Sequence, residues 1–289
     1  MISIIIPTYN NLDYLKLCIS SIKKNSFYEH EILIHINEGS DGSLEYVTKN
    51  NFKYSYSIKN TGLCIGCNNI AKKSTYDYLL YSHDDMYFCP NWDKILLDEA
   101  KSLGHNKFYL SSIMINGDPK LKGHLNFDAG ETVHKFDENK LLENYDKLKH
   151  EDFQGSTWAP HLIHKDIWNR VGGFSEEFSP GIGSDPDLNM KLWKEGIRIF
   201  KALGKSKVYH FGSVTVRKKN DITFKKKLGS NANKIFLLKW GITIKFFKKY
   251  YLRSDTKYEG VLNEPKKNIN YCLELIKVKL TYIYNLLLK

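Results

Sequence analysis

The chain has 289 residues, of which 42% are hydrophobic and 13% aromatic, so it can bury a sizeable core and a disordered protein is excluded. No apolar run is long enough to span a bilayer. The formal net charge of +11 resides in the last quarter of the chain: residues 218–289 carry 17 basic and 5 acidic side chains, whereas residues 1–217 carry 26 and 27. The chain therefore divides into a near-neutral body and a basic tail.

The first half of the body alternates between short apolar runs and amphipathic segments. Strands are predicted at Ile2–Pro7, Glu31–Ile36, Tyr54–Ser57 and Tyr76–Ser82, and helices at 12–24, 44–50, 64–74 and 92–103. This alternation predicts a parallel sheet with helices on both faces. In such sheets ligands bind at the carboxyl ends of the strands.

Four polar segments each follow a predicted strand: Thr8–Asn11, Asn37–Ser43, Asn60–Gly62 and His83–Asp85. Each segment alone is ordinary turn chemistry. Because parallel strands end at one edge of the sheet, we expect all four segments to converge there. Their shared position predicts a binding site rather than four unrelated turns.

The last of these segments carries two adjacent carboxylates, Asp84 and Asp85, directly after the buried strand that ends at Ser82. Carboxylates at the end of an apolar strand are costly unless a cation meets them. A divalent metal that carries a phosphate-containing ligand would meet them well. The alternative is a solvated turn, where Asp is common.

The second half of the body is less regular. Phe108–Ile115 reads as a strand, and 116–149 is polar and is predicted to form loops, including a mobile lid. This region contains four candidate metal ligands whose spacing fits no compact site, so we expect a solvated loop: His124, Asp128, Glu131 and His134. Later elements are helices at Lys165–Val171 and behind Asp187, and strands at Ile197–Ala202 and Lys207–His210.

Asp185 and Asp187 lie at or just before the start of the predicted helix behind them. Asp187 reads as a candidate N-cap residue. Asp185 stands on the other side of Pro186 and is free to point into a cleft.

The five cysteines are odd in number and irregularly spaced, which argues against a disulfide framework and for a reducing compartment. Cys64 and Cys67 form a CxxC, which we interpret as two small buried residues near a helix start rather than a redox pair. Ile2–Pro7 lacks the basic region and cleavage site of a secretory signal. We therefore expect a cytoplasmic protein.

The body resembles family 2 glycosyltransferases of the GT-A fold. The matching segments occur in the family's order over about residues 1–213, and although each is weak alone, the ordered set is specific. They are Ile5–Asn10, Asn37–Gly42, Asn60–Gly62 with Asn68, His83–Asp85, Gly172–Phe178, Ser184–Leu188 and Val208–His210.

The resemblance implies a GT-A catalytic domain at 1–217, with a nucleotide-sugar half at about 1–115 and an acceptor half at about 116–217, followed by a basic helical tail at 218–289. It implies Asp185 as catalytic base, and Asp85 with His210 as ligands of Mn²⁺ or Mg²⁺. The residues implied at the nucleotide-sugar are Pro7, Thr8, Tyr9, Asn10, Asn37, Ser40, Asn60, Gly62, Asn68 and Asp84.

These roles describe an inverting, metal-dependent glycosyltransferase. A metal would stabilise the diphosphate leaving group, and one carboxylate base with one in-line displacement would invert the anomeric carbon. The resemblance implies a UDP-sugar as donor and a glycan or lipid-linked acceptor. A sugar-1-phosphate nucleotidyltransferase is disfavoured, because Thr8–Asn11 is not a basic, glycine-rich loop.

Three positions depart from the family pattern: His83 and Ser184 stand where acidic residues are common, and Asn37 where an aspartate often reads the base. The loop after Asn37 is also one residue shorter than the common form. These departures support an alternative function, a non-catalytic module that binds a nucleotide-sugar or glycan.

The basic tail mixes lysines with aromatic residues, and an apolar stripe at helical spacing follows: Ile269, Cys272, Leu273, Ile276, Leu280, Ile283 and Leu287. Such segments bind anionic membrane surfaces or a lipid-linked acceptor. Alternatively the stripe packs on the body or on a second subunit in a homodimer. Nucleic acid is the least favoured partner, because nothing in the body resembles a nucleic-acid-binding fold.

Overall fold

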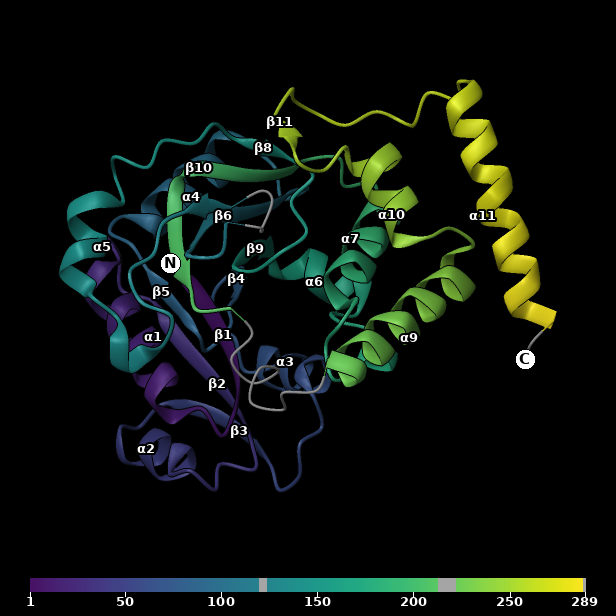
Figure 1. Ribbon diagram of the computed structural model, residues 1–289. Helices are drawn as coiled ribbons and strands as arrows, with labels where there is room; N and C mark the ends of the chain where they lie inside the picture. The colour runs from purple at the N-terminus through teal and green to yellow at the C-terminus, as the bar shows by residue number, and fades with distance from the viewer. Residues whose placement is uncertain (120–123, 213–221, 288–289) are drawn as a thin grey trace.

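The computed structural model describes residues 1–119, 124–212 and 222–287, the last range by its backbone alone up to residue 228. One sheet runs through the body with helices on both faces, and further helices lie at one side (Figure 1). The strand order is β11-β8-β10-β6-β9-β4-β1-β2-β3, with β5 paired to β10 and β7 paired to β6. The predicted α/β class with a mostly parallel sheet is confirmed.

The strands are β1 Ile2–Tyr9, β2 Glu31–Asn37, β3 Lys53–Ser57, β4 Tyr78–Tyr81, β5 Met86–Phe88, β6 Tyr109–Asn116, β7 Leu125–Asn126, β8 Phe153–Gln154, β9 His161–His164, β10 Phe200–His210 and β11 Thr256–Lys257. The helices of the body are α1 Leu12–Asn25, α2 Ser43–Lys49, α3 Leu63–Ala71, α4 Trp92–Ser102, α5 Glu138–Asn144, α6 Lys165–Val171 and α7 Ser184–Lys194. Those of the tail are α9 Ile222–Trp240, α10 Ile244–Phe246, a π-helical turn at Phe247–Leu252, and α11 Ile269–Leu287.

The centre of the sheet is the parallel block β4-β1-β2-β3. Its central strand β1 is an isoleucine-rich run with helices packed on both sides, and Ile4, Ile5 and Ile6 are fully buried. Because β1, β2 and β4 are parallel, their carboxyl ends meet at one edge, where Tyr9, Asn37 and the residues after Tyr81 lie.

Two predictions about the second half of the body were incomplete. The strands expected at Ile197–Ala202 and Lys207–His210 are one strand, β10, whose pairing with β6 shifts register between Leu203 and Lys207. Region 116–149 contains α5, whose Leu141 is buried in a second apolar cluster with Tyr209 and Phe211. The region thus packs on the sheet instead of forming only loops.

The tail packs on the body over much of its length. β11 extends the sheet through β8, and many apolar residues of the tail are buried in the main core, among them Phe236, Phe246, Phe247 and Leu262. The boundary that we predict between residues 217 and 218 lies outside the described residues.

Over the described residues, none of the helices combines the length and the apolar character that crossing a membrane requires. All five cysteines are free, and both members of the CxxC are buried on α3. Cys64 and Cys67 are therefore core residues of a helix start, as predicted.

Candidate active site

A cavity of about 280 Å³ opens at the carboxyl ends of β1, β2 and β4. It is lined from the first half of the body by all of His83–Asp85 and by part of each of the other three predicted polar segments, and from the second half by residues 180–182, 184 and 185. The predicted site residues that line it are Pro7, Thr8, Tyr9, Asn37, Asn60, Gly62, Asp84, Asp85 and Asp185. The structure thus brings nine residues spread over 179 positions into one cavity.

Hydrogen bonds between the segments fix this wall of the cavity. Thr8 Oγ1, at the end of β1, donates to Asp84 Oδ2 at 2.7 Å, and both side chains are buried. Asn37 Oδ1, at the end of β2, accepts from the Thr61 backbone N–H at 2.9 Å. These bonds tie each segment to its neighbour, so the cavity is formed before a ligand arrives.

Gly62 is required where the two halves of the body meet. Its φ is +84°, and a Cβ added there would lie 2.9 Å from Pro180 Cα. The next residue, Leu63, donates its N–H to the Pro180 carbonyl at 3.1 Å. Any larger side chain at Gly62 would push residues 180–185 away from the first half of the body.

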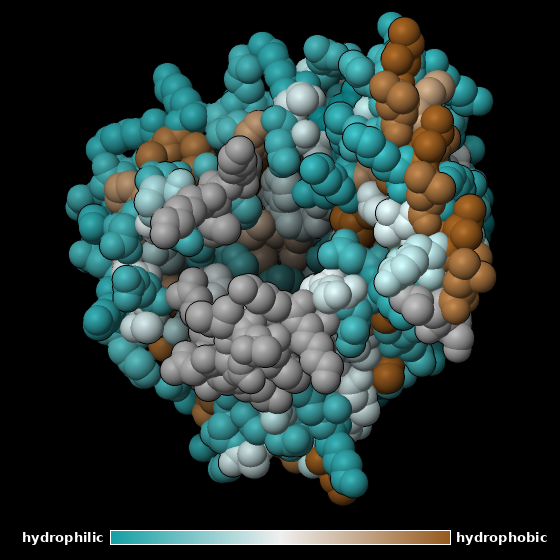
Figure 2. Space-filling view, turned by 45° about the vertical axis from the view of Figure 1, so that its right-hand side comes forward, coloured by the Kyte–Doolittle hydropathy of each residue, from teal (hydrophilic) through white to brown (hydrophobic). Residues whose placement is uncertain are grey.

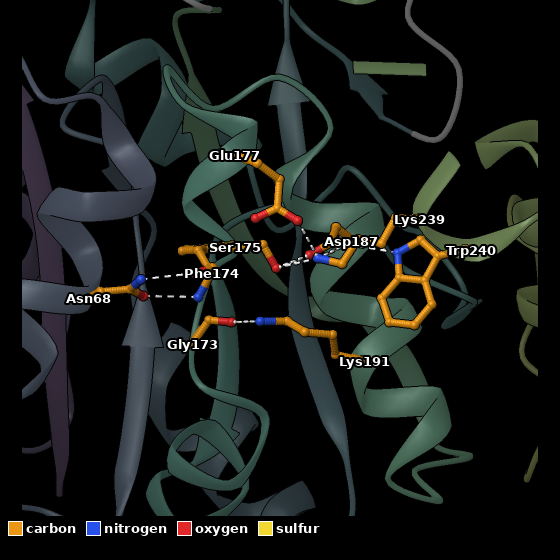
Figure 3. Close-up of polar contacts among 9 residues, drawn as sticks. All are labelled: Asn68, Gly173, Phe174, Ser175, Glu177, Asp187, Lys191, Lys239 and Trp240. Atoms are coloured by element: carbon orange, nitrogen blue, oxygen red, sulfur yellow. Dashed lines mark hydrogen bonds and ion pairs between the residues drawn. The ribbon is translucent and has the colours of Figure 1, made fainter. Parts of the chain in front are cut away.

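Three other residues that we predict at the nucleotide-sugar lie outside the lining of the cavity: Asn10, Ser40 and Asn68. Asn10 donates to Glu38 at 3.1 Å and accepts from the Ser40 N–H at 2.9 Å, so Asn10 and Ser40 shape the loop behind the cavity. Asn68 makes two hydrogen bonds to the backbone of Phe174, at 2.8 and 2.9 Å (Figure 3). Its amide thus joins α3 to the segment before α7.

The turn after β4 holds a cluster of metal-competent side chains. Asp85 Oδ1 lies 3.3 Å from His210 Nε2 and 3.8 Å from His83 Nδ1. The sheet explains the meeting of residues 125 positions apart: β5 pairs antiparallel with β10, with His210 opposite Met86. The Phe211 N–H also donates to the Asp85 carbonyl at 3.1 Å.

The donor set of this cluster fits a divalent metal. The three ligand atoms lie within 4.8 Å of one another, and His210 Nε2 is buried without a hydrogen bond among the described residues. Burial lowers the pKa of His83, which keeps its imidazole neutral and able to ligate. A carboxylate and two imidazoles suit Mn²⁺ better than Mg²⁺, which prefers oxygen ligands.

His83 is absent from the metal ligands inferred from the sequence. One sequence feature indicates it: a second metal-competent side chain two positions before Asp85 in the same turn. Across the part of the chain that the structure describes, only His83, Asp85 and His210 form such a cluster.

Asp185 lies in the first turn of α7 and faces the cavity from the second half of the body. Its Oδ1 is buried and has no hydrogen-bond partner among the described residues. Burial raises the pKa of this carboxyl to about 7. A carboxyl with such a pKa can accept a proton near neutral pH.

Asp187, one half-turn further on, does not cap the helix: Gly183 is the N-cap residue. The Asp187 carboxylate is buried and accepts hydrogen bonds from Ser175 Oγ at 2.5 Å and Trp240 Nε1 at 2.8 Å. It also pairs with Lys239 Nζ at 3.0 Å. Figure 3 shows these groups converging on Asp187, so the end of α9 anchors the start of α7.

Several residues of the cavity are missing from the sequence-based set: Leu63, Tyr81, Pro180, Gly181, Ile182 and Ser184. The run Ser179–Gly183, rich in glycine and proline before a helix, is the sequence feature that indicates a shaped loop here. Ser184 Oγ donates to the Gly181 carbonyl at 2.6 Å, which stabilises that loop.

The family model for glycosyl transferase family 2 matches residues 3–171, more than half of the chain. The chain belongs to glycosyl transferase family 2. The match covers the walls built by β1, β2 and β4 with Asp84 and Asp85. Asp185 and His210 lie beyond it, so their assignment depends on the geometry described above.

Chondroitin synthase of Escherichia coli is 24% identical to this family 2 chain over an alignment of 243 residues that covers 72% of the chain and 34% of the relative. The chain thus spans about a third of the length of that curated relative. Similarity in structure extends to S. aureus TarS 1–349 in complex with UDP, with a TM-score of 0.54, 17% identity and coverage of 81% of this chain and 71% of that one.

GalNAc-T7, crystallised with UDP, GalNAc and Mn²⁺, gives a TM-score of 0.55 at 16% identity over 73% of this chain and 43% of that one. At these identities the solved structures establish the fold alone, which is GT-A. The basic helical extension that follows the sheet in this family 2 chain is present as α9 to α11.

Proposed function

We propose that the protein is an inverting glycosyltransferase that moves a sugar from a nucleotide-diphosphate donor to a hydroxyl group of a glycan or lipid-linked acceptor. The observation that carries this proposal is one cavity that combines the candidate donor-binding segments and Asp85 from the first half of the body with Asp185 from the second half. Over the described residues, the buried Oδ1 of Asp185 has no hydrogen-bond partner. A binding module has no need of a carboxyl whose pKa is raised into the neutral range.

The donor is a UDP-sugar. Two facts support this choice: the cavity occupies the strand edge where nucleotides bind in α/β sheets, and TarS and GalNAc-T7 were crystallised with UDP. Pro7, Thr8, Tyr9 and Asn37 are proposed to contact the base and ribose, and Asp84 the ribose and diphosphate. Asn10, Ser40 and Asn68 act from outside the cavity by holding the loops in place.

The metal site is proposed at Asp85 and His210, with His83 as a third ligand, and Mn²⁺ is the preferred ion. When bound, the ion neutralises charge that develops on the departing diphosphate. The chain's own contribution is to hold one carboxylate and two imidazoles close together, and the antiparallel pairing of β5 and β10 brings His210 to the other two.

Asp185 is proposed to take the proton of the acceptor hydroxyl as its oxygen attacks the anomeric carbon. The carbon–oxygen bond to the diphosphate breaks as the new bond forms on the opposite face, so the configuration inverts. Asp185 lines the cavity from the first turn of α7, and His83–Asp85 line it from the turn after β4. Its burial among apolar walls makes it a stronger base than an exposed aspartate.

The test is a panel of UDP-sugars assayed for hydrolysis and transfer with Mn²⁺, Mg²⁺ or chelator. We expect turnover with Mn²⁺ to exceed turnover with Mg²⁺, and Asp85→Asn to lower it at least about 100-fold, because even groups that only support metal ligands cost 10–100-fold. Asp166→Asn is the matched control, since its side chain is 70% exposed and remote from the cavity.

Turnover that survives both chelation and Asp85→Asn would refute the metal site. The competing function is that of a non-catalytic binding module. It is supported by the departures from the family pattern at His83, Asn37 and Ser184. Calorimetry distinguishes it: tight UDP-sugar binding without hydrolysis or transfer across the panel would establish the module instead of the enzyme.

A further inference from the structure

The last helix, α11, has two apolar faces. Its inner face packs on the rest of the protein through Tyr271 and Val278, which are buried, and through Leu275 and Tyr282. The spacing of these residues is that of one side of a helix. The inner face therefore accounts for how α11 is held, and the outer face contributes nothing to that contact.

The outer face carries the apolar stripe predicted from the sequence. Its six large residues are between 52% and 81% exposed: Ile269, Leu273, Ile276, Leu280, Ile283 and Leu287. Tyr284 and Leu286 are exposed beside them. In the space-filling view these side chains appear as a brown band along the right-hand edge of the molecule (Figure 2). We call these eight residues the outer band.

The outer band is too large and too regular to be incidental. A helix of 19 residues is about 28 Å long, and the band follows its whole length. Singly scattered apolar residues are normal on protein surfaces, but a contiguous band of this size marks an interaction surface. The other apolar face of the same helix already satisfies its packing on the body.

The charges around the outer band are almost entirely positive. Lys277 and Lys279 are exposed on α11 itself, and Lys266 and Lys267 are exposed just before it. The single acidic residue of the helix, Glu274, is neutralised by Lys249 at 2.5 Å and accepts a hydrogen bond from the Tyr250 hydroxyl at 2.8 Å. A partner that covers the band therefore meets cations beside an apolar strip.

We propose that the outer band docks on an anionic lipid surface, with α11 lying in the plane of the membrane interface. The apolar side chains would enter the boundary of the acyl chains, and the lysines would meet the phosphate groups of the lipids. The inner face keeps the body attached on the aqueous side. This inference does not depend on the proposed enzymatic function.

Charge argues against a second copy of the chain as the occupant. The 4-3 spacing of the six residues also suits a coiled coil, but it covers fewer than the three to four heptads that such a structure normally needs. Lys277 and Lys279 occupy the positions that flank the seam, where coiled coils place complementary charges. Two copies would bring lysines toward lysines without an acidic partner.

The test is co-sedimentation of the full chain with vesicles of phosphatidylcholine alone or with 30 mol% phosphatidylglycerol, a composition on the order of that of anionic membranes. We expect binding to the anionic vesicles that weakens with salt, and little binding to the neutral ones. Ile276→Ser with Leu280→Ser should weaken anionic binding at least about tenfold, because two apolar anchors are lost. Both residues are exposed, so the fold should remain intact.

Val261→Ser is the matched control, since Val261 is 60% exposed but lies before α11. For the charges, Lys266→Glu with Lys277→Glu should weaken binding, and Lys205→Glu, in the body, should not. Equal binding of all variants, or none to anionic vesicles, would overturn the proposal. So would a dimer in analytical ultracentrifugation that the Ile276→Ser, Leu280→Ser variant dissolves, because a second copy would then cover the outer band.

Discussion

The first turn of α7 carries two aspartates, Asp185 and Asp187, whose carboxyl groups lie in opposite environments. On the cavity side, one buried oxygen of Asp185 has no hydrogen-bond partner among the described residues, and the pKa of this carboxyl is raised to about 7. On the opposite side, the fully buried Asp187 is met by Ser175, Lys239 and Trp240. Two residues apart, one carboxyl has a raised pKa and the other is paired by three side chains.

We infer that Asp185 serves function and that Asp187 supports the structure around it. We call the face of the turn that carries Asp185 the reactive side and the face that carries Asp187 the supporting side. A carboxyl without partners costs stability, and such strain persists only where the surrounding structure holds it in place. Asp187 supplies this support, because its hydrogen bonds link α7 both to residues 173–177 and to the end of α9. We infer that the tail helps to position Asp185, although the described residues that line the cavity all belong to the body.

The largest expected effect is on the reactive side. Asp185→Asn should lower turnover about 10²–10⁴-fold, the usual contribution of a general base, while UDP-sugar binding stays within a few fold of the wild type. Turnover is measured by release of UDP, and binding by calorimetry. Asp166→Asn, on the exposed start of α6, is the matched control. Unchanged turnover in Asp185→Asn would exclude this residue as the base.

The second effect falls on the supporting side. Asp187→Ala should destabilise the fold by about 3 kcal/mol, a factor of about 100 in the folding equilibrium, because it removes the acceptor of the Ser175 hydroxyl and of the Trp240 N–H and leaves Lys239 with Glu177 as its carboxylate partner. Urea unfolding measures this loss, with Asp166→Ala expected within about 0.5 kcal/mol of the wild type. A loss as small as that of the control would mean that the cluster around Asp187 contributes no stability.

The sequence predicts the reactive side better than the supporting one. β1 and β4 are recognisable as β-branched or apolar runs, and once they are parallel, Thr8 and Asp84 must share an edge. That reasoning needs only local patterns and one topological rule. It places Asp85 at the cavity as well, because the residue follows directly from the end of β4.

Long-range partners are what the sequence could not predict. The meeting of His210 with Asp85 depends on the pairing of β5, a strand of three residues, with β10, so the family resemblance indicated it and no local pattern did. Asp187 reads locally as an N-cap, and its real partners Lys239 and Trp240 come from a helix more than 50 positions later. α5 was missed because its short apolar pattern is embedded in a charged segment, and the burial of Leu141 with Tyr209 and Phe211 cannot be recognised from the local sequence.

The pH dependence tests the raised pKa of Asp185 directly. The base must be ionised, so kcat/KM should rise with pH, reach half its plateau near pH 7 and be about tenfold below the plateau at pH 6. Saturating Mn²⁺ is used, and UDP-sugar binding is measured at each pH to remove any effect of the histidines. A profile that is flat between pH 6 and 8 would contradict the raised pKa.

Stability gives an independent measure of the same shift. Because the folded pKa lies above the unfolded value of 3.8, the folded state holds more protons in between, and the free energy of unfolding contributed by Asp185 falls as pH rises from about 4 to 7. Asp185→Asn should therefore gain stability relative to the wild type above pH 7, and the two should converge near pH 4. Each kcal/mol corresponds to about 2–4 °C in Tm.

The smallest effect probes a single bond of the supporting side. Trp240→Phe removes the N–H that donates to Asp187 but keeps an aromatic ring and leaves Lys239 in place. We expect a loss of about 1–2 kcal/mol in urea unfolding, because a bond to a charged acceptor is stronger than a neutral one. Trp158→Phe is the matched control: its Nε1 donates to the neutral Ser112 carbonyl at 3.1 Å, so its loss should be smaller.

The kinetics of Trp240→Phe test whether the contacts around Asp187 on the supporting side affect turnover through Asp185 on the reactive side. If the cluster around Asp187 positions Asp185, kcat should fall a few fold with KM unchanged, because only the alignment of the base is disturbed. If Trp240 only stabilises the fold, kcat measured well below Tm should equal that of the wild type while the loss of stability remains. The second result would separate the two sides of α7 completely and limit the role of the tail to folding.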